Sequence, residues 1–159
     1  MSGAVKSFDM WRTRITMSLK ATPDRIIDHI PSGYPNNIRW NAGHILANFY
    51  EKMEPLSKEN QRLDPLYNDL FLNGTSPHDW DFDQVPSLDT LIEELEKQND
   101  WVQRNAGTLV TARLETPFRG METGEELLQL LTGHDCLHLG VINGIKYASG
   151  IRNVWKPEH

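Results

Sequence analysis

Two histidines stand one helical turn apart near the C-terminal end of the chain. They belong to a mainly apolar series with steps of three and four residues, namely Leu127, Leu131, His134, His138, Val141 and Ile145. Such spacing is typical of the core-facing side of a helix, so both imidazoles should project from that side. A buried polar group without a partner costs roughly a few kcal/mol. A divalent metal ion would satisfy both rings, since the i, i+4 pair supplies two ligands from one helix.

A third histidine, His44, lies in a second periodic stretch, where its side borders the apolar face. Gly43 beside it lowers helix propensity by about 1 kcal/mol relative to alanine, which indicates a close approach to the backbone there, although helix packing alone would also explain it. Three imidazoles would leave one coordination position open, as in catalytic metal sites. Without a metal, the same three histidines would be hydrogen-bonded in a polar core.

Other reactive patterns fit less well. A zincin protease needs a glutamate after the first histidine of its motif, and this chain has Asp135. Cys136 lies two residues from each histidine of the pair, on the opposite side of the helix, so we expect a buried structural cysteine rather than a ligand. The remaining histidines are predicted to lie on the surface: His29, His78 and His159.

Several polar residues could support the site without binding the ion. Asp135, Asn48 and Glu51 could orient the ligand imidazoles, but spacing alone does not decide the rotation of each helix. Asn99 interrupts another apolar series, where we expect it to fix helix register, and a polar contact in the core is the alternative.

The elements that must position these residues are mainly helical. The first helix is predicted from about Ser7 to Lys20, with an apolar stripe of Phe8, Trp11, Ile15 and Leu19 that Met10 and Met17 broaden. Periodicity and caps predict further helices from Asp24 to Ile30, from Ile38 to Met53, from Leu88 (capped by Ser87) to about Leu109, and from the capping box of Thr123 and Glu126 to before Gly150. A proline-rich crossover, residues 56–86, should pack over one end of the helices, with a short helix possible at 64–72. A small hairpin is possible within residues 110–119. We therefore expect an all-α, antiparallel four-helix bundle with a long crossover between its second and third long helices.

Composition limits the function. The 159 residues fit a single domain, 1–159, and their net charge of −6 without a Lys/Arg cluster argues against nucleic-acid binding. No apolar run is long enough to span a membrane, and the first residues lack the apolar part of a signal peptide. A single cysteine agrees with a reducing compartment, so we expect a cytoplasmic protein without a membrane partner.

The combined motifs resemble the DinB/YfiT-like family of four-helix proteins. The resemblance rests on residues 41–47 (Asn-Ala-Gly-His-Ile-Leu-Ala), on residues 134–140 (His-Asp-Cys-Leu-His-Leu-Gly), on the early segment 11–14 (Trp-Arg-Thr-Arg) and on the order of helices. It implies an up-down-down-up bundle, a divalent metal held by His44, His134 and His138, and, as frequently in this family, a homodimer. Family members with known activity include transferases and isomerases that use low-molecular-weight thiols.

Two functions follow as hypotheses. The first is a metal-dependent enzyme, an S-transferase or hydrolase of a small-molecule substrate, in which metal-bound water or thiolate attacks and a low-molecular-weight thiol is a possible cofactor. Zinc or nickel is the expected ion, with iron or manganese as alternatives. The second is a stress-related binding or structural protein whose metal site is not catalytic. An open coordination position beside a concave pocket would favour the enzyme.

Overall fold

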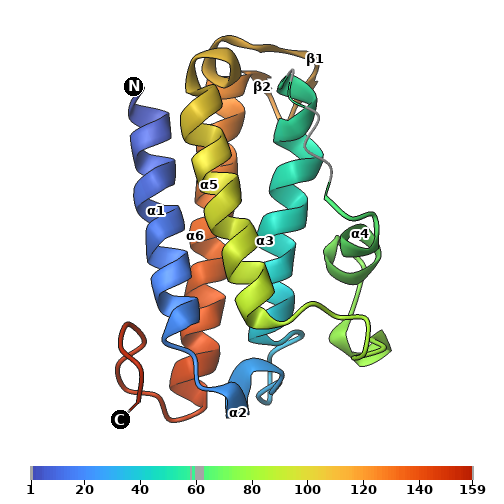
Figure 1. Ribbon diagram of the computed structural model, residues 1–159, viewed down its shortest axis with the longest axis vertical. Coiled ribbons are helices and arrows are strands. Elements are labelled where there is room, and N and C mark those ends of the chain that lie inside the picture. Colours follow the sequence, from blue (N-terminus) through green and yellow to red (C-terminus); the bar gives the residue numbers. More distant parts are fainter. Residues whose placement is uncertain (1, 58, 60–62, 159) are drawn as a thin grey trace.

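The chain is mostly helical in the computed structural model, which describes residues 2–57, 59 and 63–158 (Figure 1). The α-helices are α1 (Gly3–Lys20), α2 (Asp24–Ile27), α3 (Ile38–Met53), α4 (Leu66–Phe71), α5 (Leu88–Thr111) and α6 (Gly124–Ala148). Two 3-10 turns, η1 (Glu54–Leu56) and η2 (Pro77–Asp79), lie in the crossover, and two antiparallel strands, β1 (Arg113–Phe118) and β2 (Met121–Thr123), form a hairpin between α5 and α6.

The long helices α1, α3, α5 and α6 lie side by side (Figure 1). Helix α1 packs against α5 and α6, and α3 packs against the same two helices. In Figure 1 the chain runs downward in α1 and α6 and upward in α3 and α5. Helices α3 and α6 are therefore antiparallel neighbours.

The predicted caps start these helices. The Asn37 side chain accepts the backbone N–H of Trp40 at 2.8 Å, so α3 begins where the sequence indicated. At the start of α6 the Thr123 hydroxyl accepts the N–H of Glu126, and the Glu126 carboxylate accepts the N–H of Thr123, which completes the capping box. These caps fix where the two histidine-bearing helices begin.

Some residues predicted for the core lie elsewhere. Helix α1 turns its predicted side inward, since Phe8, Ile15 and Leu19 are buried. Met10 and Met17, which were expected to broaden that side, are instead 47% and 46% exposed. On α5 the buried polar residue is Gln98 rather than Asn99, which is only half-buried and donates a hydrogen bond to Asp9. Neighbouring residues of a helix point about 100° apart, so only one of the two lies inside.

Other boundaries also differ from the prediction. Helix α1 begins at Gly3, where the Ser2 side chain accepts the N–H of Val5, and α2 ends at Ile27 rather than Ile30. Within the crossover α4 forms close to the predicted place, but it packs along the side of α3 rather than over an end of the long helices (Figure 1). This position brings the crossover next to His44.

Candidate metal centre

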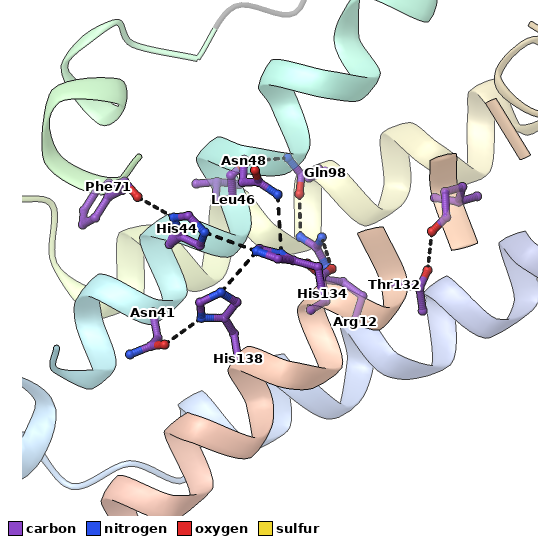
Figure 2. A network of polar contacts seen from close by, with 12 residues as sticks. Arg12, Asn41, His44, Leu46, Asn48, Phe71, Gln98, Thr132, His134 and His138 are labelled. Carbon is purple, nitrogen blue, oxygen red and sulfur yellow. Dashed lines mark hydrogen bonds and ion pairs between the residues drawn. The ribbon is translucent and has the colours of Figure 1, made fainter. Parts of the chain in front are cut away.

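The structure brings together the three histidines that the sequence singled out. His44 comes from the middle of α3, and His134 and His138 come from successive turns of α6 (Figure 2). The Nε2 atom of His134 lies 3.3 Å from Nε2 of His44 and 3.2 Å from Nε2 of His138. One nitrogen from each of the three rings lies within 4.8 Å of the other two. The cluster is thus compact enough to surround one ion.

The distances between the nitrogens match the size of a metal ion. Two imidazole nitrogens bound at about 2.0–2.1 Å to one tetrahedral zinc ion lie about 3.3–3.4 Å apart. The separations of 3.2 and 3.3 Å around His134 are close to that value. Three nitrogen donors occupy three corners of a tetrahedron, so a fourth position would remain for another ligand.

His44 is held on two sides. Its Nδ1–H donates to the carbonyl oxygen of Phe71 at 2.7 Å, which leaves the Nε2 lone pair free to face the other rings. Trp40, one turn earlier on α3, stacks on the imidazole with ring centroids 4.7 Å apart and an angle of 9°. Burial is the main cause that lowers the pKa of His44, and it outweighs the opposing effect of the Phe71 carbonyl. A neutral ring of fixed orientation is what metal binding requires.

His138 has a similar arrangement on α6. Its Nδ1–H donates to Oδ1 of Asn41 at 2.8 Å, so its Nε2 also points into the cluster without a proton. Burial, followed by the charges of His134 and His44, lowers the pKa of His138 to about 3. This ring therefore stays neutral over the whole physiological range.

His134 is the least enclosed of the three. Its side chain is 29% exposed, whereas His44 is buried. The amide nitrogen of Asn48 lies 3.4 Å from its Nδ1, and Oδ1 of Asp135 lies 3.9 Å from the same atom. The cluster is thus open to solvent on the His134 side.

Asp135, the residue after His134, forms a buried ion pair with Arg12. Arg12 of α1 is 1% exposed; it donates to Oδ2 of Asp135 at 2.7 Å and to Oε1 of Gln98 at 2.5 Å (Figure 2). Gln98 in turn donates to the backbone carbonyl of Leu46 on α3. Arg12 and Gln98 were not predicted from the sequence. A signal was present for Arg12, because it occupies an apolar position of α1, four residues after Phe8 and three before Ile15.

The other residues considered from sequence lie outside the cluster. Cys136 is partly exposed, so the prediction of a buried cysteine was wrong, and burial, with Asp135 second, raises the pKa of its thiol. His29 and His78 are exposed, in agreement with the prediction, and His159 lies outside the described residues. Glu51 forms an ion pair with Lys52 at 2.6 Å, which gives its carboxylate a partner other than a histidine.

A hollow of about 440 Å³ opens where α3 ends and α6 begins. Its walls include Lys52, Leu56, Phe118 and Leu127. Lys52 follows His44 by eight residues and Leu127 precedes His134 by seven, which corresponds to about 10–12 Å along the helices. The hollow therefore lies beside the histidine cluster along the same pair of helices, and not over it.

Fold and site together define a helical protein with a three-histidine cluster between two antiparallel helices. The model of the DinB superfamily matches residues 7–142, so the chain belongs to the DinB superfamily. A comparison with proteins of curated function found no match. Within the part of the chain that is described, no helix combines the length and apolarity needed to cross a membrane.

Proposed function

We propose that this protein is a metal-dependent enzyme whose ion is held by Nε2 of His44, His134 and His138. The observation that carries the proposal is the convergence of one ring nitrogen from each histidine to within 4.8 Å of the others. Nε2 of His134 lies 3.3 Å from that of His44 and 3.2 Å from that of His138, close to the separation of two ligands around a tetrahedral ion. The hydrogen bonds that Nδ1 of His44 and His138 make on the far side of each ring support it, because they set the tautomer that a metal ligand needs.

The donor set narrows the choice of ion. Three neutral imidazoles suit zinc, nickel, copper or iron, whereas manganese prefers oxygen ligands, and none of the three clustered side chains is a carboxylate. Zinc and nickel are therefore the first ions to test. Membership of the DinB superfamily supports a divalent ion of this kind.

Different residues of the chain would have different roles at such a site. A bound ion would supply a Lewis acid that lowers the pKa of a water or thiol at the fourth position. His134, at the exposed edge, leaves room for that ligand and for a small-molecule substrate to approach. The ring of His44 is held by its contacts with Phe71 and Trp40, and the ring of His138 is held by Asn41. This geometry supports S-transfer from a low-molecular-weight thiol, or hydrolysis if water takes the position.

Elemental analysis of protein purified without an affinity tag is the first test. We expect close to one equivalent of zinc or nickel per chain, and a loss of that metal in His44→Ala and in His138→Ala. His78→Ala is the matched control, because His78 is exposed and lies outside the cluster, and it should retain the metal. Unchanged metal content in both cluster variants would contradict the proposed site. The metal-loaded protein would then be screened against cellular thiols paired with electrophiles, and against hydrolysable esters and amides.

A second candidate is a binding or stress-related bundle protein whose metal is not catalytic. The position of the hollow favours it, since its wall residues Lys52 and Leu127 lie about 10–12 Å along the helices from His44 and His134. A metal-loaded protein that binds ligands but turns over none of the thiol and ester panel would support this second candidate.

The remaining expectations stay predictions. We infer one domain of the up-down-down-up four-helix type, cytoplasmic in location and dimeric. The directions of α1, α3, α5 and α6 in Figure 1 support the topology. Leu137 and Tyr147 on α6, 65% and 56% exposed, are candidates for the dimer interface. Light scattering of the wild type and of Leu137→Asp tests the dimer.

A further inference from the structure

The three histidines do not have equivalent surroundings. His44 and His138 each donate Nδ1–H to an oxygen, from Phe71 and Asn41. The atom closest to Nδ1 of His134 among the contacts described is instead the amide nitrogen of Asn48, which is a donor. His134 therefore accepts at Nδ1 and carries its proton on Nε2, the atom that faces the other two rings.

A proton on Nε2 of His134 fits the metal-free cluster, but it prevents this atom from binding a metal ion. The Nε2–H of His134 can donate to Nε2 of His44 at 3.3 Å or to Nε2 of His138 at 3.2 Å. A metal ion at this place requires the Nε2 lone pair, so His134 must carry its proton on Nδ1 instead. The Nδ1–H then needs an acceptor, because metal-bound histidines almost always donate their other N–H.

Asp135 is placed to be that acceptor. Its Oδ1 lies 3.9 Å from Nδ1 of His134, so a small rotation of the ring or the carboxylate brings the two into hydrogen-bond distance. Its Oδ2 is already held by Arg12 at 2.7 Å. One carboxylate oxygen is thus anchored and the other faces the histidine.

Arg12 keeps the carboxylate in place. Arg12 and Asp135 are 1% and 2% exposed, and a second guanidinium N–H is bound by Gln98, which is itself anchored to the backbone of α3. The pair joins α1 to α6 one residue beyond His134 (Figure 2). Loss of either partner would leave the other charge buried and unpaired, which is strongly unfavourable, so the contact between them is kept.

We propose that Arg12, Gln98 and Asp135 are positioning residues, in which Asp135 accepts the Nδ1–H of His134 when a metal ion is bound and Arg12 holds the carboxylate for this contact. The inference rests on the proposed metal site. Atoms balance without a further reactant: the proton of His134 moves from Nε2 to Nδ1 by exchange with solvent, which reaches this partly exposed ring. The charge of the buried pair does not change.

The test is zinc affinity, measured by competition with a chromophoric chelator. Asp135→Asn should bind zinc roughly 10- to 100-fold more weakly than the wild type. Asp28→Asn is the matched control, because Asp28 also pairs with an arginine of a helix, Arg39, at 2.6 Å, but not at the cluster, and its zinc affinity should equal that of the wild type. Because Asp135→Asn leaves a buried arginine without its partner, the double variant Arg12→Met/Asp135→Leu provides a second protein in which both charges are absent, and it should bind zinc with a similar loss.

Nitrogen-15 NMR of the zinc-loaded protein provides a readout that folding alone does not change. In the wild type the His134 ring should be protonated at Nδ1, with its proton shifted downfield by a carboxylate partner, and this shift should disappear in Asp135→Asn. If Asp135→Asn bound zinc as tightly as the wild type does, the inference would be overturned, but the proposed metal site would stand. A loss of affinity confined to Asn48→Leu would overturn it as well, by assigning the acceptor role to a reoriented Asn48 amide. A wild type that binds neither zinc nor nickel would overturn both the inference and the proposed function.

Discussion

Phe71 lies against the backbone of α3 at Gly43, where a side chain of any size would overlap its ring. The same residue accepts the Nδ1–H of His44 through its carbonyl oxygen. Glycine at position 43 therefore allows α4 to approach α3 closely enough for this hydrogen bond. The cost in helix propensity that the sequence suggested is explained by this contact, which orients the histidine.

Gly43→Ala should lower both metal affinity and stability. The added methyl displaces Phe71, which weakens the hydrogen bond to His44, and overpacking of this kind lowers the free energy of unfolding by about 1–3 kcal/mol. The gain in helix propensity, about 1 kcal/mol, is smaller. Urea unfolding and chelator competition measure the two effects.

Gly107→Ala is the control for Gly43→Ala. Gly107 lies within α5, and a methyl group added there would have no neighbouring atom of the described residues within 4 Å. This variant should gain up to about 1 kcal/mol of stability and keep the metal affinity of the wild type. Equal behaviour of the two variants would contradict the role assigned to Phe71.

Removal of one partner of the buried ion pair should be more harmful than removal of both. Arg12→Met leaves the Asp135 carboxylate buried without its cation, so we expect the free energy of unfolding to fall by about 3–5 kcal/mol. Arg12→Met/Asp135→Leu should recover most of this loss, because apolar side chains can fill the same space. Urea unfolding of the metal-free proteins measures both. A double variant as unstable as Arg12→Met would mean that packing, not charge, accounts for the loss.

The metal-free protein should lose stability in mild acid. The pKa of His138 is lowered to about 3 in the folded state, mainly by burial, and is about 6.5 in an unfolded chain. Between these values the unfolded chain binds a proton that the folded protein excludes, so the free energy of unfolding falls as pH decreases from about 6.5 toward 3. Unfolding curves at pH 7 and pH 4.5 should show this, with a smaller decrease in His138→Gln. An identical decrease in that variant would assign the effect to other groups.

A buried lysine should make the free energy of unfolding depend on pH in alkaline solution. Lys146 is fully buried, donates to the carbonyl oxygens of Ser18 and Val154, and has a pKa lowered by burial to about 8. Between about pH 8 and 10.5 the folded protein loses this proton before the unfolded chain does, so the contribution of Lys146 to stability rises with pH. Comparison of the free energies of unfolding of the wild type and Lys146→Met at pH 7.5 and pH 9.5 isolates the contribution of Lys146. A difference in stability that does not change with pH would contradict the shifted pKa.

Local patterns in the sequence were sufficient to place the long helices and to single out the three histidines. Periodicity identifies a helix because side chains three and four residues apart share one side, and this property is local. The caps of α3 and α6 are local as well, so the pair on α6 and the position of His44 on α3 could be recognised from the amino-acid sequence. The small hairpin and α4 also follow from local signals.

Which polar side chains lie inside, by contrast, depends on the packing of the helices. Periodicity identifies the apolar side of a helix but not how far the buried region extends around it. For this reason Asn99 was chosen in place of Gln98, and the methionines of α1 were expected inside. The partners of Arg12 are 86 and 123 residues away in sequence, and the partner of His44 Nδ1 is a backbone oxygen that every residue carries. Such contacts form only when α1, α4 and α5 pack against α3 and α6, and no local pattern encodes that packing.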